Sequence, residues 1–175
     1  MTPEFSRPFD VRHVEGLHVR LEPDAAERAA LARRFGLVSV DSLAADLDLA
    51  CRQRAGGFQI EASGVLTAQI VQSCAVSAED LPVTVNEPLF FRFVPQSTTY
   101  AADEEVELTA EELDEIEYEG THFDLGEAVA QSLALAIDPF LVGPQAEAAR
   151  RAAGIGIPED ASPFAALKGL KLGKD

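Results

Sequence analysis

Residues 43–74 read LAADLDLACRQRAGGFQIEASGVLTAQIVQSC, and this stretch decides the fold class. From Leu43 to Cys51 an apolar side chain recurs at every second position, with charged or small residues between. A period of two indicates a strand with one buried face. The residues at 54–57 predict a hairpin turn, and the alternation resumes from Phe58 onward. The sequence therefore predicts two long strands that pair with each other.

Further strands are predicted on both sides of this hairpin. Alternation over 17–21, 82–93 and 116–118 indicates three more, the last with acids on its second face. Pro88 interrupts the 82–93 run and favours an edge strand or a bulge. Gly64, inside the hairpin, predicts a bulge or bend because glycine has no side chain to pack. We expect about six or seven strands, mostly antiparallel.

Two helices are predicted to pack on this sheet. Pro23 and Asp24 open the first, over 23–35, because proline suits the first turn and an acid suits the positive helix end. Asp124 is an N-cap for the second, over 124–137, and Glu127 supplies its capping-box partner. This second helix is apolar around most of its circumference, Leu135 included, which predicts deep burial. A small helix is predicted over 146–153.

The predicted fold class is α+β: a mostly antiparallel curved sheet or small β-barrel with two packed helices and a mobile C-terminal tail. Residues 1–144 are predicted to form a single domain, and 145–175 a linker with a short amphipathic segment. The large side chains expected in the core are Phe9, Phe58, Phe90, Phe91, Phe93, Phe123 and Phe140.

The net charge of −16 is unevenly placed along the chain. Residues 55–149 contain 18 acids and one base, a net of −17, so the remainder is close to neutral. Such a field repels bare phosphate and attracts basic partners, although solubility alone also explains it. The candidate partner-binding face is the acidic run Asp103, Glu104, Glu105, Glu107, Glu111, Glu112, Asp114, Glu115, Glu117 and Glu119. The alternative is a merely solvated acidic surface.

Positive charge gathers in two places outside the acidic run. Arg28, Arg33 and Arg34 form a cluster on the first predicted helix and are possible RNA contacts. All three lysines of the chain lie in the tail. The tail motif there consists of Pro163, Phe164, Leu167, Lys168, Leu170 and Lys171. It is predicted either to dock on a partner or to pack on its own domain.

No catalytic or metal site can be assembled from the motifs of this sequence. The two cysteines, Cys51 and Cys74, lack a C-x-x-C partner, and zinc sites need about four ligands. His13, His18 and His122 are the only candidates for a base that could activate Cys74. We expect no enzymatic activity, no metal and no cofactor. No signal peptide or membrane span is evident, so a cytoplasmic protein with reduced thiols is expected.

Several of these segments together resemble the YceD family. The resemblance lies in a long strand ending in Cys74, a Pro-led strand rich in Phe at 82–93, the acidic run, the helix at 124–139 and the terminal SPFAALKGLK at 162–171. Many members carry C-x-x-C where this chain has Cys74 and Ser77, and the single-Cys form is similar to the alphaproteobacterial branch.

The resemblance implies a non-enzymatic protein that acts by binding, in the accumulation or processing of large-subunit ribosomal RNA. Its expected partners are a precursor of that RNA, a basic ribosomal protein or an assembly factor, with no DNA. One alternative is an acidic chaperone-like module that masks a basic protein without contacting RNA. Another is a ribonuclease, which would gather histidines and carboxylates in one pocket.

Overall fold

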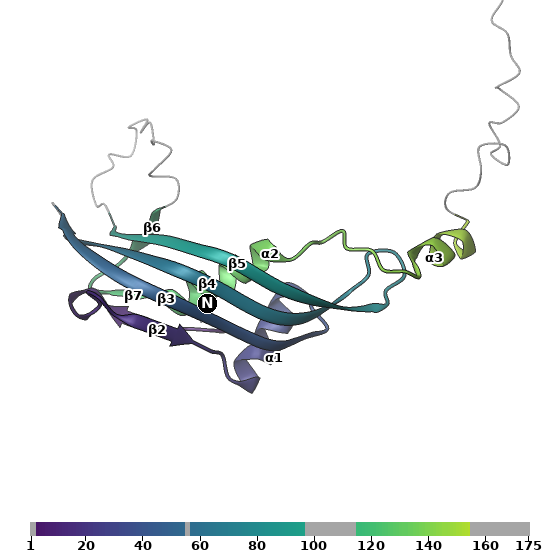
Figure 1. Ribbon diagram of the computed structural model, residues 1–175, viewed down its shortest axis with the longest axis horizontal. Coiled ribbons are helices and arrows are strands. Elements are labelled where there is room, and N and C mark those ends of the chain that lie inside the picture. Colours follow the sequence, from purple (N-terminus) through teal and green to yellow (C-terminus); the bar gives the residue numbers. More distant parts are fainter. Residues whose placement is uncertain (1–2, 55–56, 97–114, 155–175) are drawn as a thin grey trace, which may run out of the picture. The chain divides into compact units, whose positions relative to one another are not determined.

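A computed structural model describes residues 3–54, 57–96 and 115–154 (Figure 1). By its internal contacts the chain divides into two compact units. The first contains residues 1–72 and 82–138, and the second contains residues 73–81 and 139–175. The mobile tail predicted at the C-terminus lies outside the described residues. Within the described ranges, no helix has the length and apolarity needed to cross a membrane.

The first unit is built on a five-stranded sheet with the order β2-β3-β4-β5-β6. Strand β2 pairs antiparallel with β3, and β3 antiparallel with β4, whereas β5 and β6 run parallel. The strands are β2 (His18–Leu21), β3 (Ser39–Arg54), β4 (Gly57–Ser73), β5 (Asp80–Pro95) and β6 (Glu115–Tyr118). The α+β class is therefore confirmed. The described strands form an open sheet that does not close on itself, so the barrel alternative was wrong.

The two longest strands form the predicted hairpin, in which Arg54 pairs with Gly57. The prediction of a bulge at Gly64 was wrong, because the pairing continues through Gly64 and Leu47, and the register shifts instead between Val40 and Ser42. A Cβ atom at Gly64 would lie 1.9 Å from the carbonyl oxygen of Asp46. Glycine is required there because the two backbones approach too closely for any side chain.

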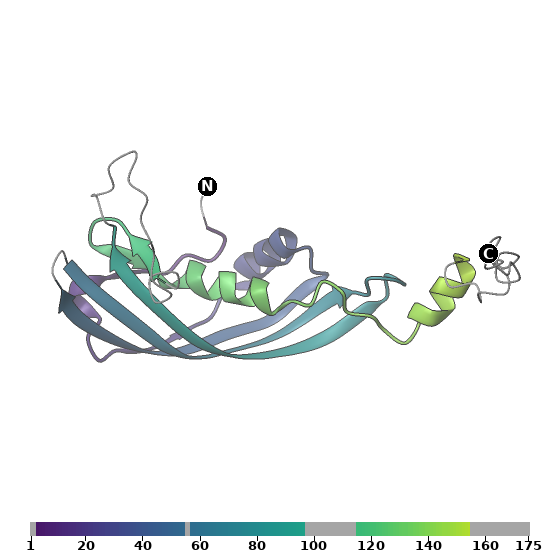
Figure 2. The same cartoon turned by 90° about the horizontal axis from the view of Figure 1, so that it is seen from above.

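Helices α1 (Ala25–Phe35) and α2 (Leu125–Ala136) both lie on one face of the bowed sheet (Figure 2). Both predicted helices are thus confirmed. The complete capping box belongs to α1, where the Asp24 carboxylate accepts from the Glu27 N–H and the Glu27 carboxylate accepts from the Asp24 N–H. At α2, Asp124 caps the Glu127 N–H, but the Glu127 carboxylate binds Arg34 instead.

A small β-ribbon joins the N-terminal segment to the start of α2. Strand β1 (Pro8–Asp10) pairs antiparallel with β7 (His122–Asp124), and a short 3-10 helix, η1 (Val11–His13), follows β1. The sequence reading missed β7, because three residues are too few to show an alternation. Its Phe123 ring lies 4.5 Å, centroid to centroid, from the Phe93 ring and so ties the ribbon to the core.

The alternating burial along the strands agrees with the predicted parity, but three large side chains that were predicted to be buried are exposed. Phe91 and Phe93 point into the core, whereas Phe90, between them, faces outward and is 57% exposed. Leu135, on the last turn of α2, is 88% exposed, and Phe140, beyond the end of that helix, is 80% exposed. The core gains instead the fully buried Phe5, which the sequence reading did not select.

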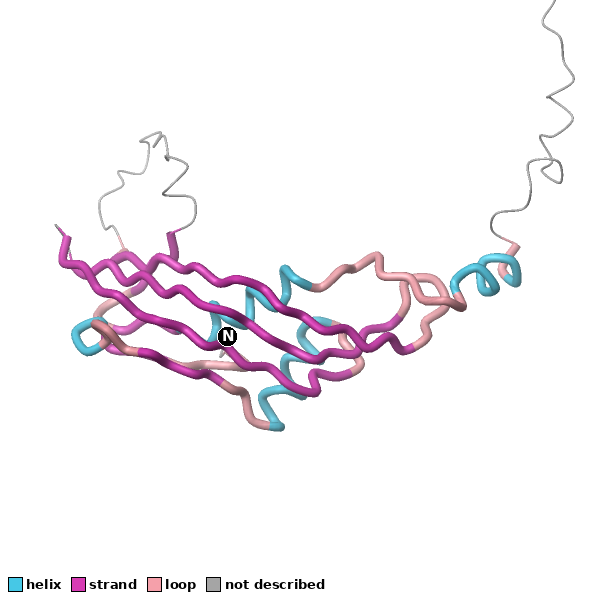
Figure 3. Tube along the Cα trace, in the orientation of Figure 1, coloured by secondary structure: helices cyan, strands magenta, loops and turns pink. Residues whose placement is uncertain are grey.

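Among the described strands, one edge of β5 is paired over only part of its length. Strand β6 pairs only with Arg92–Pro95 of β5. No other strand in the described ranges lies along that edge (Figure 3). Pro88 therefore lies on an edge segment, as its position in the sequence indicated.

The second unit contributes helix α3 (Ala146–Ala152), close to the small helix predicted at 146–153. Residues 73–81 of this unit form the turn that follows β4 and the beginning of β5.

We predict that Gly64→Ala destabilises the protein by roughly 3 kcal/mol, because the new methyl group would force β3 and β4 apart. Chemical denaturation would measure this change. Ser63→Ala, at the neighbouring exposed position, is the control and should change stability by less than about 0.5 kcal/mol. Equal stability of the two variants would contradict the close approach at Gly64.

Candidate partner-binding groove beside helix α2

The acidic run that the sequence analysis selected is described only at its C-terminal end. Glu115 and Glu117 lie on β6, and Glu119 follows it. The remaining acids of the run, from Asp103 to Asp114, lie outside the described residues. The structure therefore places three members of the predicted face, all at one edge of the five-stranded sheet.

Two of these acids, Glu117 and Glu119, border a groove of about 260 Å³ between β6, β7 and α2, which we call the acidic groove. Its apolar lining comes from Phe93, Ile116, Phe123 and Ala128. Four carboxylates line it as well: Glu117, Glu119, Asp124 and Glu127. Tyr118, His122 and Gln131 complete the lining, and no Lys or Arg of the described ranges belongs to it. A cationic ligand with an apolar part matches this combination of groups.

The four carboxylates differ in the hydrogen bonds and ion pairs that they already make within the protein. Asp124 accepts hydrogen bonds from the Ser6 hydroxyl and from the N–H groups of Arg7 and Glu127. Glu127 is paired with Arg34. Glu117 and Glu119 are exposed and make no hydrogen bond or ion pair with any other described residue. These last two are therefore the carboxylates available to a partner.

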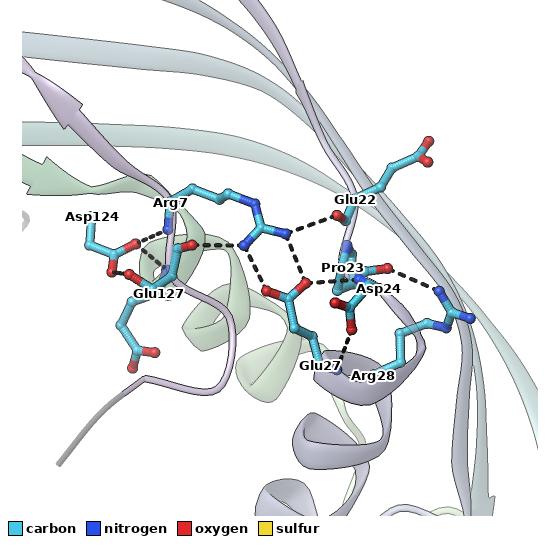
Figure 4. Close-up of polar contacts among 9 residues, drawn as sticks. Arg7, Glu22, Pro23, Asp24, Glu27, Arg28, Asp124 and Glu127 are labelled. Atoms are coloured by element: carbon cyan, nitrogen blue, oxygen red, sulfur yellow. Dashed lines mark hydrogen bonds and ion pairs between the residues drawn. The ribbon is translucent and has the colours of Figure 1, made fainter.

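The N-terminal end of α2 is held by a polar network, which Figure 4 shows. The Arg7 guanidinium makes two hydrogen bonds, of 2.7 and 2.8 Å, to the Glu27 carboxylate on α1. The same residue donates its backbone N–H to Asp124, the N-cap of α2 (Figure 4). Its carbonyl accepts from the Leu125 N–H, at 3.1 Å. Arg7 thus links α1, α2 and the N-terminal segment, which fixes one wall of the acidic groove.

A second arginine joins the same elements. The Arg34 guanidinium makes two hydrogen bonds to Glu127, at 2.7 and 2.9 Å, and a third to Glu4 at 2.9 Å. Hydrogen bonding from Arg34 is the main reason that the pKa of Glu127 lies below its ordinary value of 4.5. Arg34 also compensates the charge of one groove carboxylate, which leaves Asp124 and the two exposed acids as the uncompensated charges of the groove.

The predicted arginine cluster is therefore divided by the structure. Arg34 is engaged with Glu4 and Glu127, whereas Arg28 and Arg33 line a separate hollow of about 480 Å³. That hollow lies between α1 and the beginning of β3, and it also contains the Asp41 carboxylate. A contact between these arginines and RNA stays a prediction.

Cys74 lies in a tight turn of the second unit and is buried. Its Sγ accepts hydrogen bonds from the N–H groups of Val76 and Ser77, both at 3.4 Å, and of Gly143 at 3.2 Å. Hydrogen bonding from Ser77, through its side chain first and then its backbone, lowers the pKa of the thiol to about 7 against the opposing effect of burial. Ser77 stands where C-x-x-C sequences have their second cysteine.

The three histidines have separate local partners. His13 lies 3.9 Å from Asp10, His18 lies 2.8 Å from Asp48 across β2 and β3, and His122 contacts the hydroxyl of its neighbour Thr121. Among the described residues, no three His, Cys, Asp or Glu side chains are grouped as a metal site would require.

We predict that Arg34→Gln makes the free energy of unfolding depend less on pH in the acidic range. In the wild type, the lowered pKa of Glu127 contributes stability that is fully present above pH 4.5 and is lost as the pH falls through the folded-state pKa. Without Arg34 the folded and unfolded pKa values converge, so unfolding measured from pH 6 to pH 3 should depend less on pH. Arg33→Gln is the control, and identical profiles for the two variants would refute the role of Arg34.

We predict that the Cys74 thiol deprotonates with a midpoint near pH 7. The titration is measured from the thiolate absorbance at 240 nm in the Cys51→Ser variant. Burial raises the pKa of Cys51, so that residue is removed to leave one thiol. Ser77→Ala should move the midpoint upward because the largest hydrogen-bond contribution is lost. A midpoint at or above the ordinary value of 9 in the Cys51→Ser protein would contradict the prediction.

Comparison with known proteins gives one match. A search of curated proteins and a search of solved structures each found none. A family model described as "Large ribosomal RNA subunit accumulation protein YceD" matches residues 62–171, well over half of the chain. The matched range contains most of β4, all of β5, β6, β7, α2 and α3, and therefore every residue that lines the acidic groove. The chain belongs to the YceD family of large ribosomal RNA subunit accumulation proteins.

Proposed function

We propose that this protein promotes the accumulation or processing of large-subunit ribosomal RNA by binding, without catalysing a reaction. The family description implies a role in accumulation of that RNA. In this proposal the acidic groove binds a basic ribosomal protein or assembly factor. The observation that carries it is a groove whose described lining has four carboxylates and several apolar side chains but no Lys or Arg.

The charge of the chain supports a cationic partner over a nucleic acid at this groove. Residues 55–149, which include every lining residue, contain one base against 18 acids. A field of this sign accelerates encounter with a positively charged protein and opposes the approach of phosphate. The exposed acids Glu117 and Glu119 would guide the partner, and the apolar lining would bury one of its side chains.

Contact with RNA, where it occurs, is proposed for other parts of the chain. Arg28 and Arg33 line the hollow beside α1, and the tail motif at 163–171 supplies lysines. Phosphate contacts of this kind position a protein on RNA without reading its sequence. The partner bound in the acidic groove and the RNA would then occupy different surfaces of one assembly intermediate.

A second candidate is a chaperone-like module that masks a basic protein and never contacts RNA. One observation favours it. Arg34 is already paired with two glutamates, and the hollow that holds Arg28 and Arg33 also contains Asp41. The positive surface in this region is therefore small. RNA crosslinking in cells separates the two candidates, because only the first predicts crosslinks to large-subunit RNA precursors.

We predict that the double variant Glu117→Lys with Glu119→Lys recovers about tenfold less large-subunit protein in pull-downs, equivalent to roughly 1.4 kcal/mol of binding free energy. The reversed charges repel a basic partner at the groove. Asp80→Lys with Glu147→Lys, two exposed acids of the second unit, changes the net charge equally and is the matched control.

The experiment decides the proposal in two ways. Recovery of no ribosomal component by the wild type, even at low salt, would refute binding to assembly intermediates. Equal losses in the groove variant and the control would show that net charge, and not the acidic groove, determines recovery.

A further inference from the structure

We propose that the open edge of β5 adds a strand from the protein partner, so that an extended, basic and apolar peptide segment becomes the next strand of the sheet. This inference rests on the proposed function for the basic character of the partner, and it adds the mode of binding. The edge concerned is residues 82–91 of β5. These residues pair with β4 on one side, and no described strand pairs with them on the other.

The backbone groups on this edge can be assigned from parity. The Gln96 N–H donates to the Tyr118 carbonyl at 2.9 Å, so even-numbered N–H groups face the side of β6. Successive N–H groups of a strand point to opposite edges. The N–H groups of Thr84, Asn86 and Phe90 therefore face the open edge. Pro82 and Pro88 have the same parity, as expected for residues whose missing N–H would face away from the sheet.

Apolar side chains border the open backbone. A groove of about 280 Å³, which we call the edge groove, lies between β5 and the last turns of α2. Its main lining residues are Leu89, Phe90 and Phe91 on the strand and Ser132, Leu135 and Ala136 on the helix. Phe90 and Leu135 are the most exposed large apolar side chains among the described residues of the first unit. A strand added here would cover Phe90 on one face and Leu135 on the other.

The charge of the groove lining indicates which residue types the added segment should contain. Among the residues that the structure describes, Glu87 is the only charged one that lines the edge groove. The acidic groove is lined by an earlier part of the same helix, since Gln131 of α2 lines that groove and Ser132 lines the edge groove. A segment with apolar residues on the α2 side and basic residues on its other face would use both grooves. A basic protein partner with an extended segment meets this description.

A second copy of the chain fits the edge less well. In a symmetric antiparallel pair of β5 edges, each strand would present its two prolines and its Glu87 to the other. Prolines and charges on edge strands are devices that prevent such self-pairing. The same features tolerate a foreign strand, because Thr84, Asn86 and Phe90 keep their edge N–H groups.

The test uses the full chain and a fluorescein-labelled synthetic peptide of about ten residues with alternating valine and lysine. Binding is followed by fluorescence anisotropy. Asn86→Pro removes one edge N–H that no described residue uses, and Leu135→Glu places a charge in the apolar wall. Each should weaken binding about tenfold. Val65→Glu, an exposed apolar position on β4 away from the edge, is the control and should leave binding unchanged.

A second measurement leaves the protein unaltered and so does not depend on the folding of any variant. The peptide is N-methylated at every second residue, in two versions of opposite parity. Strand addition requires that one version lose binding and the other keep it, because only one set of N–H groups faces β5.

Each contrary result is informative. Equal binding of both N-methylated versions, or no binding of the unmodified peptide, would overturn strand addition. A third outcome is that the double variant Glu117→Lys with Glu119→Lys loses binding while Leu135→Glu keeps it. That result would show that the acidic groove alone binds the peptide, which would contradict strand addition but not the proposed function.

Discussion

The antiparallel pairing of β3 with β4 is the constraint on which the rest of the first unit depends. These two long strands supply the middle of the five-stranded sheet, and α1 and α2 pack on one face of it. Their close approach at Gly64 keeps the register continuous from the hairpin turn to the bulge near Val40. Since a shift of one residue would turn every apolar side chain to solvent, this register also determines which side of β5 and β6 faces the core.

Charge is organised around this frame in two different ways. Arg7 and Arg34 are each paired with carboxylates that join α1, α2 and the N-terminal segment, so their charges serve the fold. Glu117 and Glu119 have no such partner among the described residues and remain exposed. Paired charges stabilise a particular geometry, whereas unpaired charges of one sign produce a field that extends into solvent. Only the second group would take part in the proposed binding of a basic partner.

The surface along α2 combines features that a monomer usually avoids. An open strand edge, two exposed large apolar side chains and unpaired acids all lie beside one helix. Contiguous exposed apolar surface with a polar rim is typical of interaction sites. Family membership links the chain to large-subunit ribosomal RNA accumulation, and the protein partner that we propose is assigned to this surface for these physical reasons.

The sequence by itself determined the α+β class, the long hairpin, both packed helices and the acidic character of the middle region, because periodicity and local capping are properties of neighbouring residues. Only the tertiary structure decided the rest. It brought Glu117 and Glu119 beside Asp124 and Glu127, engaged Arg34 but not Arg33, buried Phe5, and exposed Phe90 and Leu135. Those outcomes depend on contacts between residues far apart in the chain, which no local pattern encodes.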